Sequence, residues 1–261
     1  MAVLSAQSLS GLPEVRPGDD LAELIVAALD DRPLRSGQLV AIAQKVVSKS
    51  EGAVVALADV RPSARALELT DVLAGPPGSA AVERKDPRFV QVVLDESAEL
   101  VRAERGVLVS RTHHGFVCAN AGVDASNAAQ LDTLILLPRD PDASARRLRA
   151  RLRELTGASV GVLISDSFGR AWRHGQLDIA IGLAGMQPLD DWRGRTDARG
   201  MELRATWLAV ADAAAATAEL VRAKDSREPV VLLDGLERYL TDEDGPGAVA
   251  LLRALEEDLF R

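Results

Sequence analysis

The sequence predicts an α+β fold with mixed sheets and packed helices. Helix-like and strand-like segments are interspersed along the chain, but they do not follow one another as clean strand–helix–strand units. No internal repeat and no long linker interrupts them. This order favours α+β over a doubly wound parallel sheet. We expect one domain over residues 1–261, which could divide into two subdomains.

In the first half of the chain, residues 16–31 (RPGDDLAELIVAALDD) predict an amphipathic helix. Leucine and isoleucine recur there at helical spacing after an aspartate that can cap the helix. The apolar run 38–47 (QLVAIAQKVV) predicts a buried strand that ends at 48–52. The other elements expected here are strands at 53–60, 107–110 and 116–119, helices at 62–74 and 86–100, and a loop at 74–80.

In the second half, residues 139–157 (RDPDASARRLRARLRELTG) form the clearest predicted helix. Asp140 can cap it, Pro141 suits its first turn, and Gly157 can end it. The remaining expected elements are strands at 132–138, 159–165, 176–185 and 228–233, and helices at 205–223 and 247–259.

Composition limits the classes of function. With 47% hydrophobic residues the chain can build a core, and its net charge of −8 disfavours nucleic acid and anionic membranes as partners. The single cysteine, Cys118, allows no intrachain disulfide. The start of the chain lacks a signal peptide's features, and no apolar run approaches the roughly 20 residues that span a bilayer. We expect a cytoplasmic protein.

Several familiar signatures are missing. The sequence has no G-x-x-x-x-G-K-[ST], no G-x-G-x-x-G and no G-x-S-x-G. Any nucleotide is therefore bound by a less familiar route. His113 and His114 are adjacent, so on a strand they would face opposite ways, and we interpret them as surface or hydrogen-bonded residues. Cys118 lies in an apolar run and is expected to be buried.

Two apolar runs each stop at an aspartate near a hydroxyl or amide residue. The segment 115–127 ends with Asp124 and Asn127, and the segment 161–170 continues into Asp166 and Ser167. One interpretation is that these are ordinary turn formers. The other is that two strand ends supply oxygen ligands to one Mg²⁺ or Mn²⁺ ion.

Basic and mixed polar segments add to the second interpretation. Lys45 and Lys49, four residues apart at the end of an expected strand, would share a face and suit a polyphosphate, although a solvated surface fits them too. The segments 165–182 and 189–203 combine aspartates, arginines and tryptophans, as a polar active site or a solvated loop would.

At these residues the chain resembles the coenzyme F420-0:L-glutamate ligase family. The resemblance covers residue 11 to about residue 235. The stretches that carry it are GLPEVRPGDDL (11–21), KVVSKSEG (45–52), HGFVCANAGVDASN (114–127), LLPRDPDASA (136–145), SDSFGRAWRHGQLDIAIG (165–182) and LDDWRGRTDARGMEL (189–203).

The resemblance implies an enzyme that adds L-glutamate to coenzyme F420-0 in a GTP-dependent reaction through an acyl phosphate, with release of GDP and phosphate. It also implies Mn²⁺ or Mg²⁺, often together with K⁺, and an intertwined homodimer. By position, Asp124 and Asp166 would hold one metal and Ser167 a second, and the catalytic residues would be Asp124, Asp166 and Lys49. The implied nucleotide contacts are Leu12, Pro13, Glu14, Val15, Gln44, Lys45, Lys49, Asn127, Arg222, Ala223, Lys224, Asp225, Ser226, Arg227, Glu228 and Pro229.

The chain departs from the family pattern at a few positions. Ser167 stands where threonine is usual and keeps the hydroxyl, whereas Lys224 and Met201 stand where glutamine and asparagine are common. A charged lysine cannot ligate a metal. Two alternatives follow: a related GTP-dependent ligase that acts on another carboxylate acceptor, and a non-catalytic homologue that binds a nucleotide or a deazaflavin.

Overall fold

The computed structural model describes residues 3–74, 84–125, 132–223 and 225–258. These residues form two compact units. Unit 1 consists of Met1–Ser50, Asp140–Ser167 and Leu177–Arg261, and unit 2 consists of Glu51–Arg139 and Phe168–Gln176.

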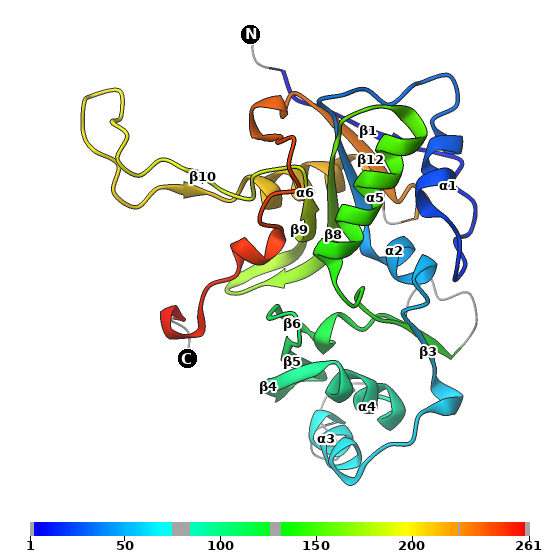
Figure 1. Ribbon diagram of the computed structural model, residues 1–261. Coiled ribbons are helices and arrows are strands. Elements are labelled where there is room, and N and C mark those ends of the chain that lie inside the picture. The colour runs from blue at the N-terminus through cyan, green and yellow to red at the C-terminus, as the bar shows by residue number, and fades with distance from the viewer. Residues whose placement is uncertain (1–2, 75–83, 126–131, 224, 259–261) are drawn as a thin grey trace. The chain divides into compact units, whose positions relative to one another are not determined.

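Unit 1 is built on a five-stranded sheet with the strand order β1-β12-β2-β8-β9 (Figure 1). Strand β12 runs antiparallel to both β1 and β2, whereas β2 runs parallel to β8. The sheet is therefore mixed, as the interspersed order of elements predicts. Its strands are β1 (Ser5–Leu9), β12 (Val230–Asp234), β2 (Leu39–Ala43), β8 (Gly161–Arg170) and β9 (Arg173–Ala184).

One face of this sheet packs against helix α6 (Val210–Val221). Leu39 and Ala41 of β2, Leu163 of β8 and Leu233 of β12 are fully buried in one cluster with the alanines of α6. Because alanine side chains are short, the helix can lie close to the sheet. The alternate residues of β2 and β8 are also buried, so both faces of the sheet are covered.

Helices α1 (Leu21–Ala28) and α5 (Pro141–Thr156) pack against each other and lie in front of the sheet in Figure 1. Their ends follow the sequence prediction. The Asp20 carboxylate accepts hydrogen bonds from the first backbone N–H groups of α1, and Asp140 does the same for α5. Gly157 ends α5 in the left-handed conformation at φ 73°, which glycine adopts without steric cost.

The outer strand β9 has carboxylates along its exposed edge. The backbone N–H of Asp178 donates to Glu219 at 2.9 Å, and that of Ala180 donates to Asp212 at 3.0 Å. Both acceptors belong to α6. These bonds satisfy amides that a further strand could otherwise pair with. Burial raises the pKa of Asp212 above its usual range.

A two-stranded arm, made of β10 (Asp190–Asp191) and β11 (Trp207–Leu208), extends away from the five-stranded sheet (Figure 1). Two arginines of the arm stack on its own tryptophan rings. Arg193 lies 4.0 Å from the ring centre of Trp207, and Arg195 lies 4.9 Å from that of Trp192.

The described residues of unit 2 form α-helices α3 and α4 and small sheets. Buried valines and leucines of α3 and α4 pack with Leu108 and Leu134 in one core cluster. Its elements are β3 (Val54–Ala56) paired with β7 (Thr133–Ile135), helices α3 (Ala64–Ala74) and α4 (Pro87–Asp95), and the sheet β4 (Ser97–Glu104), β5 (Val107–Thr112) and β6 (Val117–Ala119).

Two sequence predictions are wrong because strand pairing or helix formation overrides the local pattern. The strand expected over 38–47 ends at Ala43, where helix α2 (Gln44–Ser50) begins. The helix expected over 86–100 ends at Asp95, since the residues from Ser97 pair with β5. Part of the loop expected at 74–80 lies outside the described residues.

Two further helices are shorter than predicted or do not form. The helix expected over 205–223 begins at Val210, because Trp207 and Leu208 belong to the arm. Residues 247–259 form short 3₁₀ helices at Ala248–Leu251 and Leu255–Glu257. Val249 and Leu255 are more than half exposed, so a longer helix there would have little core to pack against. No helix in the described part of the chain is long and apolar enough to cross a membrane.

Candidate functional site

The parallel pairing of β2 with β8 ends at one edge of the five-stranded sheet, although β8 itself continues to Arg170 beside β9. Ala43 and Ser165 are paired in the β-ladder, so Gln44 and Asp166 are the next residues at the same edge. In open sheets the carboxyl ends of parallel strands are where ligands commonly bind. Both residues are among the site residues that the sequence analysis proposes.

Two more of the proposed segments reach the same edge. The backbone N–H of Ala43 donates to Pro229 O at 2.8 Å, which places the segment before β12 beside the end of β2. The Ser8 hydroxyl of β1 donates to Glu228 at 2.8 Å, so the chain leaving β1 starts here as well. We call this group of residues the sheet edge; it comprises Leu12–Val15, Gln44–Lys49, Asp166, Ser167, and the described part of 222–229.

Lys49 connects helix α2 to the first of these segments. Its Nζ donates to the Glu14 carboxylate at 2.5 Å, and its side chain is only 11% exposed, against 60% for Glu14. The sequence analysis placed Lys45 and Lys49 on a strand, which is wrong, because both lie on α2. Residues four apart also share a face on a helix, so the expectation of a common face is retained.

Gln44 is buried at the start of α2, with 1% of its surface exposed. Its Oε1 accepts a hydrogen bond from the Ser48 hydroxyl at 2.8 Å, but its Nε2 makes no hydrogen bond within the described residues. A buried amide N–H without an acceptor costs free energy unless a ligand or water satisfies it. Gln44 therefore has a donor available for a ligand with acceptor oxygens.

Asp166 and Ser167 project to opposite faces of β8, because successive residues of a strand alternate. The Ser167 hydroxyl donates to Asp178 Oδ1 at 2.6 Å, and the Ser165 hydroxyl donates to Asp178 Oδ2 at 2.8 Å. Ser165 and Ser167 thus lie on the α6 face, and Asp166 lies on the other. The expectation that Asp166 and Ser167 contribute to two different metals stays a prediction.

Asp178 is the residue that the sequence analysis missed. It lies in β9 with 1% of its side chain exposed, and it forms an ion pair with Arg222, whose side chain is 11% exposed. A signal was present in the sequence, since a lone aspartate within the apolar stretch LDIAIG must be buried together with a partner.

Asp124 belongs to unit 2, whereas Asp166 belongs to unit 1. The backbone of Asp124 is held by two hydrogen bonds to Ile135, of 3.0 and 2.8 Å. Because Asp124 and Asp166 belong to separate units, the metal that they would share stays a prediction. Asn127 and Lys224, two of the expected nucleotide contacts, lie outside the described residues.

The donor types fit a hard divalent cation. Asp124, Asp166 and Ser167 offer carboxylate and hydroxyl oxygens, which Mg²⁺ and Mn²⁺ prefer to nitrogen and sulfur. No group of three or more His, Cys, Asp or Glu residues that could hold a metal occurs among the described residues. Mg²⁺ commonly takes one or two carboxylates and completes its shell with water and phosphate, so a small carboxylate set suits it.

The other candidates have structural partners. His113 Nε2 lies 3.0 Å from Asp95 O, and His114 Nε2 lies 2.9 Å from Pro138 O, in agreement with their interpretation as hydrogen-bonded residues. Cys118 is buried, as expected. The Arg170 guanidinium donates to His174 O at 2.6 Å in the turn that joins β8 and β9.

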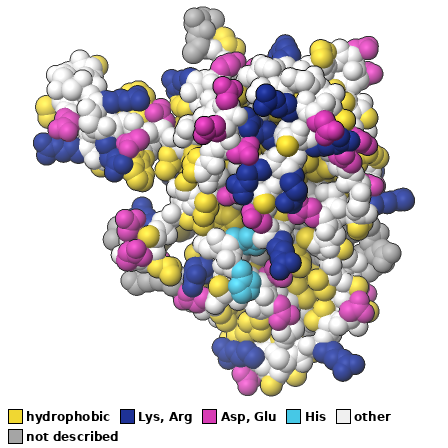
Figure 2. Space-filling model, viewed as in Figure 1, with side chains coloured by type: hydrophobic (Ala, Val, Ile, Leu, Met, Phe, Trp, Pro, Cys, Tyr) yellow, Lys and Arg dark blue, Asp and Glu magenta, His cyan; other side chains and the backbone are white. Residues whose placement is uncertain are grey.

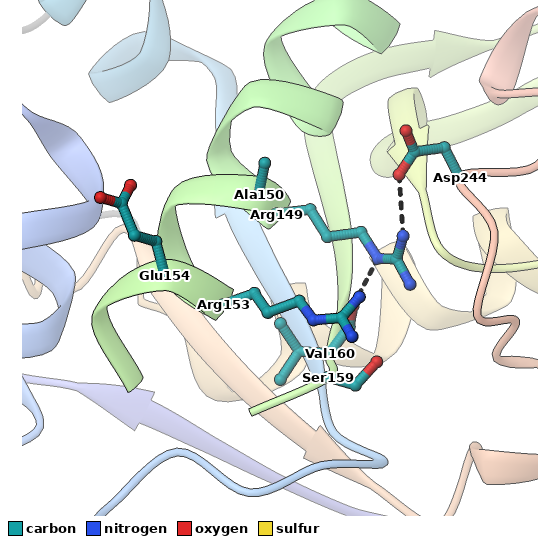
Figure 3. Close-up of a pocket in the computed structure, with 7 residues that line it drawn as sticks. All are labelled: Arg149, Ala150, Arg153, Glu154, Ser159, Val160 and Asp244. Atoms are coloured by element: carbon teal, nitrogen blue, oxygen red, sulfur yellow. Dashed lines mark hydrogen bonds and ion pairs between the residues drawn. The ribbon is translucent and has the colours of Figure 1, made fainter. Parts of the chain in front are cut away.

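A separate pocket of about 420 Å³ lies along the last turns of α5 (Figure 3). Arg149 dominates it, but this guanidinium donates to Val160 O and the Asp244 carboxylate, each at 2.8 Å, and to two further carbonyls. Arg149 therefore anchors the segment 241–244 and is not part of the sheet edge.

Figure 2 shows basic and acidic side chains interspersed over the face in view.

Comparison with known proteins matches most of the chain to one family. A family model described as F420-0:Gamma-glutamyl ligase matches residues 11–235. This range includes all residues of the sheet edge and also Asp124 and Asp178.

Curated relatives match over nearly the whole chain. A protein of Methanothermobacter thermautotrophicus named coenzyme F420:L-glutamate ligase is 40% identical, over 99% of each chain. Proteins with the same name from Methanopyrus kandleri and Halobacterium salinarum are 44% and 42% identical, over 95% and 99% of this chain and 94% and 96% of their own.

Proposed function

The chain belongs to the F420-0:gamma-glutamyl ligase family, an assignment that confirms the resemblance seen in the sequence, and it is an amide-forming ligase. From this membership we propose that it adds L-glutamate to coenzyme F420-0 in a GTP-dependent reaction. The observation that carries the nucleotide part of the proposal is the gathering of three expected nucleotide segments at the sheet edge, beside Asp166.

The proposed reaction has two steps. A carboxylate oxygen of F420-0 attacks the γ-phosphorus of GTP, the bond from that phosphorus to the bridging oxygen breaks, and GDP leaves. The amine nitrogen of L-glutamate then attacks the acyl carbon, a C–N bond forms, and inorganic phosphate leaves as the amine loses its proton. Phosphoryl transfer of this kind depends on positioning and charge neutralisation more than on a protein nucleophile.

The described residues of the sheet edge can bind and orient a nucleotide. Lys49 offers an ammonium group that now pairs with Glu14, and the exposed glutamate can move away when a phosphate approaches. The Nε2 of Gln44 offers a buried donor. These two groups would hold the phosphates in place while the acceptor carboxylate attacks.

A divalent cation, Mg²⁺ or Mn²⁺, would neutralise charge on the transferring phosphoryl group when bound. We propose that Asp124 and Asp166 hold one such ion and Ser167 a second. A requirement for K⁺ is also part of the proposal, and comparing turnover in KCl with turnover in NaCl tests it.

The direct test is a reconstituted reaction. The purified protein is incubated with F420-0, GTP, L-glutamate and MnCl₂, and the products are weighed by mass spectrometry. We expect a mass gain of one or more glutamyl units on F420-0, with one GDP formed per glutamate added. Folded protein that forms GDP only with a different carboxylate acceptor would indicate the related ligase, and GTP binding without any turnover would indicate a non-catalytic homologue.

We also propose that the protein is a homodimer. The arm supports this, because Trp207, Leu208 and Met201 are 50%, 44% and 69% exposed there. Exposed apolar groups on an extended hairpin are a common means of contact between subunits. Light scattering after size-exclusion chromatography should give twice the chain mass of 27.7 kDa; a monomer mass would contradict the proposal.

A further inference from the structure

Asp178 connects two parts of the sheet edge that the proposed function treats separately. Its Oδ1 accepts a hydrogen bond from the Ser167 hydroxyl at 2.6 Å, and its Oδ2 accepts hydrogen bonds from the Arg222 guanidinium and the Ser165 hydroxyl. Ser167 is the expected ligand of the second cation, and Arg222 begins the expected nucleotide segment. One buried carboxylate therefore touches both.

A buried ion pair in this position is not explained by stability alone. Removing two charges from water costs several kcal/mol per ion, and well-packed apolar residues commonly replace such pairs without loss of stability. The neighbours Ala180 and Ile181 in β9 are almost completely buried, so an apolar residue at position 178 would suit the strand. The pair is therefore a candidate for a role in the reaction.

The bond to Asp178 sets the orientation of the Ser167 hydroxyl. A serine hydroxyl has one proton to donate and two lone pairs that accept. When the hydroxyl proton of Ser167 points to Asp178, the lone pairs of the hydroxyl oxygen point away from this carboxylate. A divalent cation binds a hydroxyl through these lone pairs. Ser165 donates to the same carboxylate but is only 1% exposed, whereas Ser167 is half-buried. Ser165 is thus a matched residue that lacks access to a ligand.

The Asp178–Arg222 ion pair attaches the nucleotide segment, residues 222–229, to the sheet. The Nη1 of Arg222 donates to Pro229 O at 3.3 Å, so the first and last residues of the segment 222–229 are joined. Its Nη2 donates to Asp178 on β9 and to Ser165 Oγ at 3.2 Å on β8. Arg222 acts here as an anchor for the segment, and Asp178 fixes the anchor to the sheet.

We propose that Asp178 is a positioning residue that orients the Ser167 hydroxyl for a divalent cation and anchors the nucleotide segment through Arg222, so that cation binding and nucleotide binding are coupled through one carboxylate. The identities of cation and nucleotide rest on the proposed function. Asp178 touches neither ligand in this account. Outer-shell partners of metal ligands commonly contribute about 10- to 100-fold to metal affinity.

The test measures binding, without turnover. Mn²⁺ affinity is measured by electron paramagnetic resonance with saturating GDP, and GDP affinity by calorimetry with Mn²⁺. For Asp178→Asn we expect the Mn²⁺ dissociation constant to rise by about 10- to 100-fold, and GDP to bind more weakly. Ser167→Ala should reproduce the Mn²⁺ effect with GDP affinity nearly unchanged. Ser165→Ala removes a hydroxyl that contacts both Asp178 and Arg222 but lacks access to a ligand, and it leaves the Asp178–Arg222 ion pair in place. It should change the Mn²⁺ constant by less than threefold and weaken GDP binding less than Asp178→Asn does.

Two outcomes overturn the inference. One is wild-type affinity for both Mn²⁺ and GDP in folded Asp178→Asn; the other is an effect of Ser165→Ala equal to that of Asp178→Asn, which would indicate a general packing role. If Asp178→Asn does not fold, the double variant Asp178→Asn/Arg222→Gln replaces it, because neither position then carries a buried charge. The same rise in the Mn²⁺ dissociation constant is expected for the double variant.

The measurements distinguish failure of the proposed function from failure of this inference. Wild-type protein that binds neither GDP nor Mn²⁺ would refute the nucleotide-dependent ligase, whatever the variants do. Hydrogen exchange of the backbone amides in 222–229 then decides the anchoring part. We expect at least tenfold faster exchange in Asp178→Asn than in Ser165→Ala, and equal rates would overturn it.

Discussion

Two aspartate–arginine pairs of unit 1 have the same chemistry in opposite surroundings. Asp178 lies in β9 and Arg222 at the end of α6, with side chains 1% and 11% exposed, whereas Asp191 and Arg193 lie in the arm with side chains 48% and 49% exposed. In the arm, hydrogen bonds from Arg193 hold the pKa of Asp191 well below its usual range, yet solvent screens the attraction. We therefore expect the removal of one partner to reduce stability strongly only in the buried pair.

A third pair lies between these extremes. Lys49 is 11% exposed and Glu14 is 60% exposed, so one partner is buried and the other faces water. The exposed carboxylate is readily solvated when the pair opens, and a phosphate that takes its place keeps the buried ammonium paired. The three pairs thus form a series from a fixed anchor, through an exchangeable contact, to a solvated surface pair.

Arg222→Met should have the largest effect on stability. It leaves the Asp178 carboxylate buried without its guanidinium, and breaking a buried pair in this way costs roughly 3–5 kcal/mol. Urea denaturation followed by circular dichroism measures the free energy of unfolding. Adding Asp178→Asn to the variant should recover most of the loss; a loss in the single variant no larger than that of an arm variant would remove the distinction between the two pairs.

Lys49→Met should weaken nucleotide binding more than it weakens the fold. We expect the GDP dissociation constant to rise at least tenfold, which is about 1.4 kcal/mol. Glu14→Gln removes the same ion pair but keeps the lysine, so it should leave GDP affinity unchanged or improve it. Calorimetric titration of both variants checks this, and equal weakening in both would mean that the pair acts as a structural unit.

Asp212→Asn should have a small effect that depends on pH. Because burial raises the pKa of Asp212, the folded state binds this proton more tightly than the unfolded state, and stability falls as pH rises from the ordinary carboxyl pKa through the raised value. Asparagine can still accept the Ala180 N–H bond. We therefore expect the variant to gain stability relative to the parent above this range and not below it.

Unfolding curves of Asp212→Asn and its parent at a series of pH values measure this difference. A gain of the same size at every pH would contradict the assignment to Asp212 ionisation. Glu219→Gln is the control variant, because Glu219 also accepts a hydrogen bond from a backbone amide of β9.

Arg193→Met should have the smallest effect on stability. The free energy of unfolding should stay within experimental error, while loss of the arginine stacked on Trp207 should change tryptophan fluorescence. A loss comparable to that of Arg222→Met would show that burial does not separate the pairs.

Local chemistry explains why part of the fold was predictable. The Asp140 cap, Pro141 in the first turn and Gly157 at the end of α5 follow rules that operate within a few residues, and the structure confirms all three. The run 38–47 was misassigned because apolar residues continue from β2 into α2, so periodicity alone does not mark the boundary at Ala43. The pairing of β4 with β5 is likewise a long-range effect.

In the candidate site, too, residue types were predictable from the sequence and long-range contacts were not. Residue types that suit phosphate and a divalent cation, namely Lys49, Asp124, Asp166 and Ser167, were identified from the sequence, and the family assignment is confirmed. Their proposed roles stay predictions. Asp178 was overlooked because an aspartate in an apolar strand becomes informative only when its partner is known, and Arg222 is 44 residues away in the chain.

The sequence by itself determined the helix caps, the mixed α+β class and the family, because each depends on short stretches of residue types in a recognisable order. Only the tertiary structure decided that the segments after β1, β2 and β8 and before β12 meet at one sheet edge, and that Asp178 is buried against Arg222. These contacts join residues far apart in the chain, and strand order and burial, which no local pattern specifies, create them.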